Sequence, residues 1–187
     1  MILRLDKVCK SFGDVVVLDN FSAVFNDGIN FLIGESGKGK TTVLRLILGL
    51  EKADSGEIDG LYNKMSAVFQ ENRLFENMTI EENVKYVTDT PIDLELVSKL
   101  CLKPYLGKEV SALSGGTKRR VEILRALSVD ADLVIMDEPF TGLDDITKIH
   151  TMDTIMEYSH NKMVIISTHD KYAIKYIGNS KNIVEVM

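Results

Sequence analysis

The sequence predicts an α/β fold with a mainly parallel core sheet, an N-terminal antiparallel β subdomain and an inserted helical subdomain. Three features of the chain lead to this prediction. Before residue 30 the sequence contains only strand patterns separated by short turns. Further along, apolar strands alternate with helical patterns, which is the order of elements that builds a parallel sheet. Between these parts, residues 71–113 lack strand patterns and contain short helical ones instead.

The first part of the chain is expected to fold mainly as strands. Alternating or β-branched patterns predict short strands at residues 2–5, 15–18 and 21–25, with turns at 13–14 and 27–28. A continuous apolar run predicts a buried strand over residues 29–33. A helix is expected from about residue 40 to residue 50, because apolar side chains recur there at helical spacing. Ser55-Gly56 is expected to form a turn, and residues 65–69 another short strand.

The second part is expected to be an inserted helical lobe followed by a return to alternating helices and strands. Short helices are expected within residues 71–113, at about 81–84 and 93–102. The elements expected later are helices at about 114–128 and 145–159, strands at 133–136 and 163–167, a further short helix and a final strand at 182–186. We therefore expect residues 1–187 to form a single domain, with 71–113 as the start of the lobe.

The composition is that of an ordinary soluble globular protein, with 45% hydrophobic and 27% charged residues. The net charge of −6 argues against a nucleic-acid partner, which would require clustered cations. The basic run Lys118-Arg119-Arg120 is interpreted as a solvated helix face. Cys9 and Cys101 lack metal-ligand spacing, which is typical of a reducing cytosol. No segment has the pattern of a signal peptide or the apolar length of a bilayer span.

One segment carries a complete phosphate-binding motif. Residues 34–41 match G-x-x-x-x-G-K-[ST] at every fixed position, between an apolar strand and a helix, which a plain Gly- and Lys-rich turn would not explain. Its glycines let backbone N–H groups turn toward a phosphate, and the helix start adds a partial positive charge. Lys40 is expected to reach the β- and γ-phosphates, and the Thr41 hydroxyl to bind Mg²⁺. The nucleotide-binding residues predicted here are Gly34, Ser36, Gly37, Lys38, Gly39, Lys40, Thr41 and Thr42.

Two adjacent carboxylates follow the apolar strand expected at residues 133–136. Acids in this place are costly to bury unless they are solvated, paired or bound to a metal. Because side chains alternate along a strand, Asp137 and Glu138 can serve different partners. Asp137 is expected to hold Mg²⁺ through water, and Glu138 to polarise an attacking water. A helix cap is the simpler explanation for Glu138 taken alone.

Together these motifs resemble the nucleotide-binding domain of ABC-type ATPases, the motor subunits of ABC transporters. Leu113-Ser114-Gly115-Gly116 resembles the family's signature sequence LSGGQ, and Asp137-Glu138-Pro139 fits its second nucleotide motif. Further segments resemble the family's Q-loop, D-loop, switch histidine and adenine-stacking aromatic, and these are Gln70, residues 141–144, His169 and Phe12. The similarity extends from about Ile2 to Asp170.

The resemblance implies an ABC ATPase type of P-loop NTPase fold, with ATP and Mg²⁺ bound and ATP hydrolysed. Glu138 would act as the base, His169 would orient the water, and Gln70 would contact both the water and Mg²⁺. Three signature residues would cover the γ-phosphate of an ATP held by a second, head-to-tail subunit, and these are Ser114, Gly115 and Gly116. Asp144 joins the nucleotide-binding set through the D-loop. A helix cap explains Ser114 alone, and a surface or capping role is the simpler reading of an isolated histidine.

The resemblance also implies partners. A membrane permease subunit and a second nucleotide-binding subunit, identical or related, are expected, with an extracytoplasmic solute-binding protein if the transporter is an importer. Import is favoured because separately encoded motors are typical of bacterial importers, although some bacterial exporters also use them. Residues 73–79 resemble the stretch that contacts the permease. The protein is expected in the cytoplasm, held at the inner face of the cell membrane by its permease, and no nucleic acid is expected as a partner.

Two residues depart from the family pattern. Thr117 stands where glutamine usually ends the signature sequence, so the contact with the second subunit is expected to change. Phe12 replaces the usual tyrosine, which keeps the aromatic face and loses the hydroxyl. A phenylalanine near a turn is as often a core residue as a stacking one.

Two other functions compete with transport. A soluble ABC-type ATPase acting on DNA or ribosomes would share the chemistry, but such proteins carry long coiled-coil insertions or two ATPase domains, and neither occurs here. A P-loop kinase or small GTPase would share only the phosphate loop and would leave the signature segment and His169 unexplained.

Overall fold

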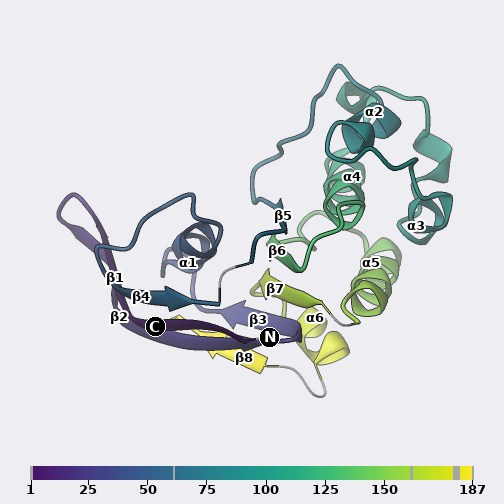
Figure 1. Ribbon diagram of the computed structural model, residues 1–187. Coiled ribbons are helices and arrows are strands. Elements are labelled where there is room, and N and C mark those ends of the chain that lie inside the picture. The colour runs from purple at the N-terminus through teal and green to yellow at the C-terminus, as the bar shows by residue number, and fades with distance from the viewer. Residues whose placement is uncertain (1, 61, 161, 179–181, 187) are drawn as a thin grey trace.

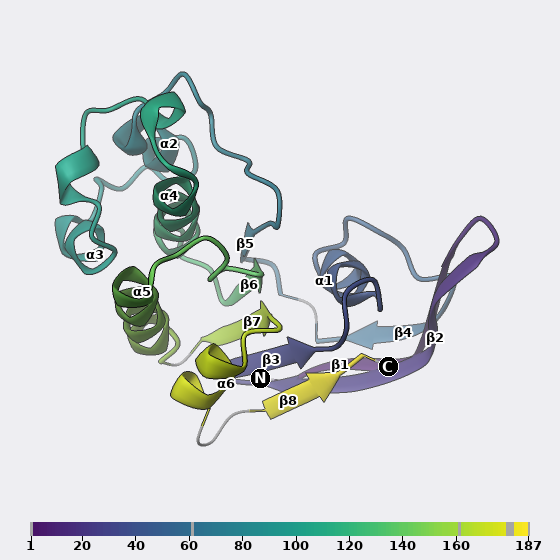
Figure 2. The same ribbon diagram turned by 180° about the vertical axis from the view of Figure 1, so that it is seen from behind.

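The computed structural model describes residues 2–60, 62–160, 162–178 and 182–186. Figure 1 shows two sheets lying side by side, with a helical lobe that extends away from them. Seen from behind in Figure 2, the lobe and the tip of the hairpin formed by β1 (Ile2–Phe12) and β2 (Val15–Asn26) lie at opposite ends of the molecule. The predicted division into an antiparallel sheet, a parallel sheet and a helical lobe is therefore confirmed.

The N-terminal sheet is antiparallel, with strand order β2-β1-β4. Its strands are β1 (Ile2–Phe12), β2 (Val15–Asn26) and β4 (Ser55–Asp59). The prediction of two short strands within residues 15–25 was wrong, because β2 continues through Asn20, whose positive φ of 50° lets the strand pass with a shift in register. The predicted turn at Ser55-Gly56 was also wrong, because Ser55 pairs with Cys9 and begins β4.

The core sheet has five parallel strands in the order β5-β6-β7-β3-β8. They are β3 (Gly28–Ile33), β5 (Met65–Val68), β6 (Leu133–Asp137), β7 (Met163–Ser167) and β8 (Asn182–Glu185). All residues of β6 and β7 are buried, as expected for apolar strands covered on both faces. The carboxyl ends of β3, β6 and β7 therefore lie at one edge of the sheet.

In the described part of the chain, four helices flank the core sheet. They are α1 (Lys40–Ile47), α4 (Gly115–Leu127), α5 (Asp145–Tyr158) and α6 (Lys171–Ile177). Helix α1 ends three residues before the predicted boundary, because Gly49 adopts a left-handed φ of 68° and its N–H closes back on the Leu46 carbonyl. Among the described residues, no helix has both the length and the apolar character that a bilayer span requires.

The helical lobe contains α2 (Ile80–Lys85), α3 (Leu94–Lys99) and two short 3₁₀ helices, η1 (Lys103–Tyr105) and η2 (Val110–Ala112). Thr79 is the N-cap of α2 and forms a capping box with Glu82. The Thr79 hydroxyl accepts from the Glu82 backbone N–H, and the Glu82 carboxylate accepts from the Thr79 backbone N–H. Buried side chains of the lobe, such as Ile80 and Leu100, belong to the same apolar cluster as those of α4 and the core sheet. Helix α4 thus connects the lobe with the edge of the sheet where the predicted site residues lie.

Candidate functional site: a nucleotide cavity at the edge of the core sheet

The phosphate loop connects the end of β3 to the start of α1. Gly39 precedes α1 with a left-handed φ of 96°, a backbone conformation that is unfavourable for residues other than glycine. A Cβ at this position would also lie 2.9 Å from Cγ1 of Val17 on the antiparallel sheet. Glycine is therefore required here for two reasons, the turn of the backbone and the close approach of β2.

Lys40 folds back across the phosphate loop. Its Nζ donates to the carbonyl oxygens of Gly34 at 2.9 Å and Glu35 at 3.0 Å. The ammonium group is thus held within reach of the loop rather than extended into solvent. An ammonium in this place is a point charge with three donors, which suits the oxygens of a phosphate.

Asp137 ends β6 beside the first turn of α1. Its Oδ2 accepts a hydrogen bond from the Thr41 hydroxyl at 2.7 Å, and its Oδ1 accepts one from the Ser167 hydroxyl. The residue is only 5% exposed. A carboxylate beside a hydroxyl supplies hard oxygen ligands of the kind that Mg²⁺ takes. No group of three or more His, Cys, Asp or Glu side chains suited to a metal occurs in the part of the chain described.

Glu138 follows Asp137 in a left-handed backbone conformation, with φ 49°. Its N–H donates to the Ser167 carbonyl at 3.0 Å, which keeps it at the end of the sheet. Its Oε1 lies 2.9 Å from Nδ1 of His169, and its Oε2 accepts from the Thr168 hydroxyl at 3.3 Å. The Glu138 side chain is largely buried while that of His169 is exposed. Non-glycine residues with such a strained backbone conformation cluster at active sites and ligand-binding sites.

These residues surround one cavity of about 700 Å³, which we call the nucleotide cavity. Its lining residues are Phe12, Val17, Gly34, Glu35, Ser36, Gly37, Gly39, Lys40, Thr41, Thr42, Gln70, Asp137, Glu138, Thr141 and His169. The cavity extends from Phe12 at the end of β1 to Gln70, which lies two residues after the end of β5. Lys38, although predicted with the loop, is exposed and does not line it. Phe12 is 45% exposed, so the core alternative for this residue was wrong.

The signature residues lie outside this cavity. Ser114 is the N-cap of α4 and is exposed, as is Gly115. A Cβ on Gly116 would lie 2.5 Å from the Gly142 carbonyl oxygen, so this glycine also permits the close packing of residues 141–144 against α4. Asp144 caps α5, and the backbone N–H and hydroxyl of Thr147 lower the pKa of its carboxyl.

Thr117 is buried beneath Ser114 rather than exposed beside it. An Arg120 guanidinium N–H donates to Thr117 Oγ1 at 3.3 Å, and arginine can only donate. The Thr117 hydroxyl can then donate to Ser114 Oγ, which lies 2.9 Å away and also accepts from the Thr117 backbone N–H at 3.3 Å. With this direction, Ser114 Oγ accepts both bonds and its own hydrogen is left to donate outward. The threonine that stands in place of the family's glutamine thus contacts the exposed Ser114 hydroxyl from the buried side.

Two arginines of the basic run were predicted wrongly as a solvated face. Arg119 and Arg120 are both buried, and only Lys118 of the three reaches the surface, where it pairs with Glu76 at 2.7 Å. Arg120 donates to the carbonyls of Leu100 and Cys101, at 2.9 and 2.8 Å. Helical periodicity alone did not reveal this, because long cationic side chains can be buried wherever carbonyl oxygens receive them.

Sequence reasoning also missed the partner of Arg119. Glu122 lies one turn further along α4 and pairs with it at 2.9 Å. Burial raises the pKa of the Glu122 carboxyl, and a hydrogen bond from the Arg73 backbone N–H together with the charge of Arg119 opposes this shift. The i, i+3 spacing of opposite charges was the available signal, but it is common on exposed helices.

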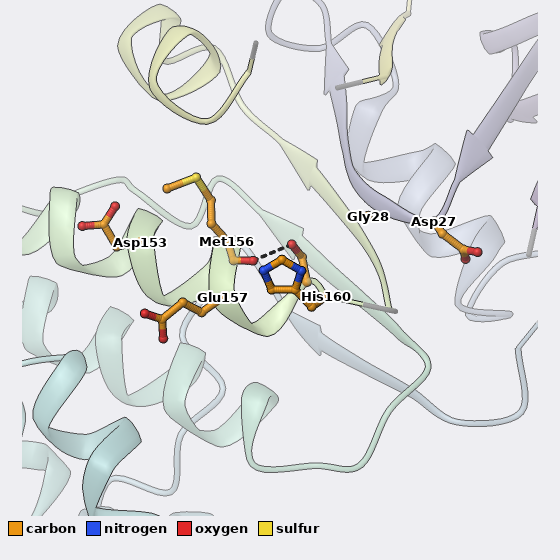
Figure 3. A pocket seen from close by; sticks show the side chains of 7 residues that line it. Asp27, Gly28, Asp153, Met156, Glu157 and His160 are labelled. Carbon is orange, nitrogen blue, oxygen red and sulfur yellow. Dashed lines mark hydrogen bonds between the residues drawn. The ribbon is translucent and has the colours of Figure 1, made fainter. Parts of the chain in front are cut away.

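A second hollow, of about 660 Å³, lies at the amino end of β3, the opposite end from the phosphate loop. Figure 3 shows its side chains, which come from the turn at Asp27-Gly28 and from the end of α5 and do not converge on a common point. The hydrogen bond drawn there, from the Ser159 hydroxyl to the Met156 carbonyl at 2.8 Å, belongs to the end of the helix. None of the residues predicted for nucleotide binding lies in this hollow.

The fold and the site together define a P-loop NTPase: a phosphate loop between β3 and α1, with a carboxylate at the end of β6 in the same sheet. Comparison with known proteins narrows this class. The family model described as ABC transporter matches residues 18–141. The chain therefore belongs to the ABC transporter family and is an ATP-binding subunit that hydrolyses ATP to ADP and phosphate.

Individual relatives agree with this family. The aliphatic sulfonates import ATP-binding protein SsuB 1 of Pseudomonas savastanoi pv. phaseolicola is 31% identical over 186 residues, which cover 96% of this chain and 78% of the relative. The aliphatic sulfonates import ATP-binding protein SsuB of Bacillus cereus is 35% identical over 202 residues, covering 96% and 79%. A solved ATP-binding subunit of an ABC transporter shares the fold, with a TM-score of 0.85 at 23% identity, covering 100% of this chain and 88% of that one.

Proposed function

We propose that this protein is the motor subunit of an ABC importer, in which ATP-driven closure of two nucleotide-binding subunits moves a solute through a separate permease. The observation that carries the proposal is an incomplete site. The nucleotide cavity collects the phosphate loop, Asp137, Glu138 and His169, whereas Ser114 and Gly115 are exposed outside it. A second subunit placed head to tail would bring its Ser114 over the open side of the cavity.

Within one subunit, hydrolysis would proceed as follows. Lys40 would exchange the loop carbonyls for the β- and γ-phosphate oxygens of ATP. Thr41 and Asp137 would hold Mg²⁺, which supplies charge neutralisation at these oxygens when bound. Glu138 would accept a proton from the water, whose oxygen bonds to the γ-phosphorus while the bond from that phosphorus to the oxygen of the leaving ADP breaks. His169 beside Glu138 would donate a hydrogen bond to the γ-phosphate.

Phe12 would stack on the adenine ring at the far rim of the nucleotide cavity. Its position is supported from below, because Nζ of Lys10 lies 5.0 Å from the centre of the ring and also pairs with Asp54 at 3.4 Å. Asp54 in turn accepts from the Ser11 backbone N–H at 2.7 Å. These contacts would hold the β1–β2 turn in place while Phe12 stacks on the adenine.

An apolar groove at the lobe supports the proposed permease contact. The groove has a volume of about 490 Å³, and we define the lobe groove by its lining residues Met65, Ser66, Ala67, Phe75, Tyr86, Val87, Arg125, Ala126 and Val129. Tyr86 is 67% exposed and its ring centre lies 4.5 Å from that of Phe75. Exposed apolar side chains gathered in this way are typical of protein contact sites. A permease segment in this groove would lie next to residues 69–73, which lead from β5 into the lobe.

The relatives support the direction of transport. Those from Pseudomonas and Bacillus are named as proteins of aliphatic sulfonate import, and this chain spans more than three quarters of their length. An import motor of this kind would be cytoplasmic, held at the inner face of the membrane by its permease, with a solute-binding protein on the other side. The substrate would be selected by the permease and the solute-binding protein.

A pull-down tests this assignment. A tagged chain recovered from detergent-solubilised membranes of its host is expected to bring a polytopic membrane protein in a stoichiometric amount, with an extracytoplasmic binding protein. Tyr86→Ser should lose most of the permease, because it removes an exposed aromatic from the lobe groove. Tyr172→Ser is the matched control, because Tyr172 is also exposed but lies on α6 outside the lobe groove. Recovery with ribosomal or DNA-bound proteins instead would favour the soluble ABC-type alternative.

Thr117 provides a test of the shared site. Thr117→Val keeps the shape of the side chain but removes the hydroxyl that orients Ser114, so kcat and ATP-induced dimerisation are expected to fall about 2- to 10-fold. Binding of ATP to the single subunit should not change, because Thr117 does not line the nucleotide cavity. Thr117→Ser retains a hydroxyl and should restore most of the rate. Equal rates for the valine and serine variants would contradict the proposed orientation of Ser114.

A further inference from the structure

Helix α4 carries a buried ion pair whose contacts lead away from the helix. The Arg119 and Glu122 side chains are 10% and 4% exposed and lie 2.9 Å apart. Arg119 donates one further hydrogen bond to the Phe69 carbonyl and another, at 2.7 Å, to the Gln70 carbonyl. Glu122 accepts from the Arg73 backbone N–H at 2.9 Å. One ion pair therefore holds three backbone groups of residues 69–73.

These three backbone groups bracket Gln70. The Gln70 side chain lines the nucleotide cavity, while its own carbonyl oxygen is bound to Arg119. The guanidinium of Arg73 lies 3.7 Å from the centre of the Phe69 ring, so the two ends of the segment also contact each other. Residues 69–73 belong to no helix or strand, so these contacts take the place of a regular hydrogen-bond ladder.

The chemistry of the ion pair explains why it fixes the position of the backbone. A buried charge is costly unless its hydrogen-bonding groups are satisfied, so the pair is stable only in a narrow range of geometries. The planar guanidinium offers donors in fixed directions, which here serve two adjacent carbonyls and one carboxylate. A lysine in the same place would offer a point charge without this planar geometry. Movement of residues 69–73 relative to α4 would therefore break several bonds at once.

We infer that Arg119 and Glu122 are positioning residues that hold the backbone of Gln70 against α4, so that its side-chain amide reaches the Mg²⁺ and water of the bound nucleotide. Because α4 begins at Ser114, the same helix carries the residue that would cover the partner subunit's ATP. The pair thus links the two nucleotide sites through one rigid element. This inference rests on the proposed function, in which Gln70 contacts the metal and the water.

The test compares three variants of the full chain. Arg119→Met combined with Glu122→Leu replaces both charges with apolar side chains of similar size, which avoids leaving one charge buried alone. Gln70→Ala removes the amide itself, and the triple variant carries all three changes. Lys99→Met is the control, because Lys99 loses exposed ion pairs to Glu95 and Glu157 that do not contact residues 69–73.

We expect the double variant to bind ATP within about twofold of the wild type and to hydrolyse it about 10- to 100-fold more slowly, because the amide is misplaced rather than lost. It should also need more Mg²⁺ for half-maximal activity, as should Gln70→Ala. The triple variant should be no slower than Gln70→Ala, because the pair acts only through Gln70. Arg119→Lys should recover part of the rate by serving one of the two carbonyls.

Each other outcome has a defined meaning. If Gln70→Ala hydrolyses ATP at the wild-type rate, the proposed role of Gln70 fails and this inference fails with it. If Gln70→Ala is slow but the folded double variant is not, only the positioning role is overturned. Additive losses in the triple variant would show that the pair supports the fold in general. If circular dichroism shows that the double variant is unfolded, Arg119→Lys takes its place in the comparison. An Arg119→Lys protein with the same Mg²⁺ dependence as the wild type would then overturn the inference.

Discussion

Glu138→Gln is expected to lower kcat for ATP hydrolysis by about 10²- to 10⁴-fold while leaving ATP binding intact. The amide can still accept a hydrogen bond from Thr168, but it cannot accept a proton from water at neutral pH. Closed pairs of subunits would then form on ATP and fail to reopen. The measurement is steady-state phosphate release, combined with light scattering after gel filtration in saturating Mg-ATP.

The control for this variant is Glu57→Gln, an equal change at an exposed position of β4 outside the nucleotide cavity. It should leave both the rate and the oligomeric state unaltered. A Glu138→Gln protein that hydrolyses ATP normally would remove Glu138 from the chemistry. If it hydrolyses ATP slowly yet stays monomeric in saturating Mg-ATP, the result supports Glu138 as the base but not the pairing of identical subunits.

Lys40→Ala is expected to weaken ATP binding by about 10- to 100-fold, since charge-assisted hydrogen bonds to the phosphates are lost. In the present structure the ammonium already lies 2.9 Å from the Gly34 carbonyl, inside the nucleotide cavity. Titration calorimetry with ATP and with adenosine gives the measurement, and adenosine affinity should change little because it carries no phosphate.

Lys38→Ala is the matched comparison for Lys40→Ala, because it removes the same charge from the same loop. Lys38 is exposed and does not line the nucleotide cavity, so a several-fold smaller loss of affinity is expected. Equal losses in the two variants would indicate that the loop attracts ATP by net charge alone. Unchanged binding in Lys40→Ala would rule out the phosphate-loop assignment.

Local patterns predicted the elements that carry the phosphate chemistry. The phosphate loop lies between a strand and a helix as the pattern predicted, with only the end of α1 three residues short, because glycine and apolar periodicity act within a few residues of their own position. The two carboxylates at the end of β6 could be predicted for the same reason. The polar strand β4 could not, because its residues gain strand geometry only by pairing with β1.

The main error of the sequence-based prediction concerned the burial of charged residues. Arg119 and Arg120 are buried because carbonyl oxygens from residues 69–70 and 100–101 come within reach of their guanidinium groups. These acceptors lie 19 to 50 residues away in the chain. No local pattern carries that information, since it depends on how the lobe packs on α4.

By itself the sequence determined the class of this protein, the phosphate loop and the acids beside it, because each motif encodes its own backbone geometry. Only the tertiary structure decided which residues share a cavity, that Ser114 and Gly115 are exposed outside it, and that Thr117 lies beneath Ser114. It also decided that Arg119 and Glu122 hold the backbone of Gln70. The physical reason is the same in each case: burial and long-range hydrogen bonds arise when distant elements pack, and a single segment does not specify its partners.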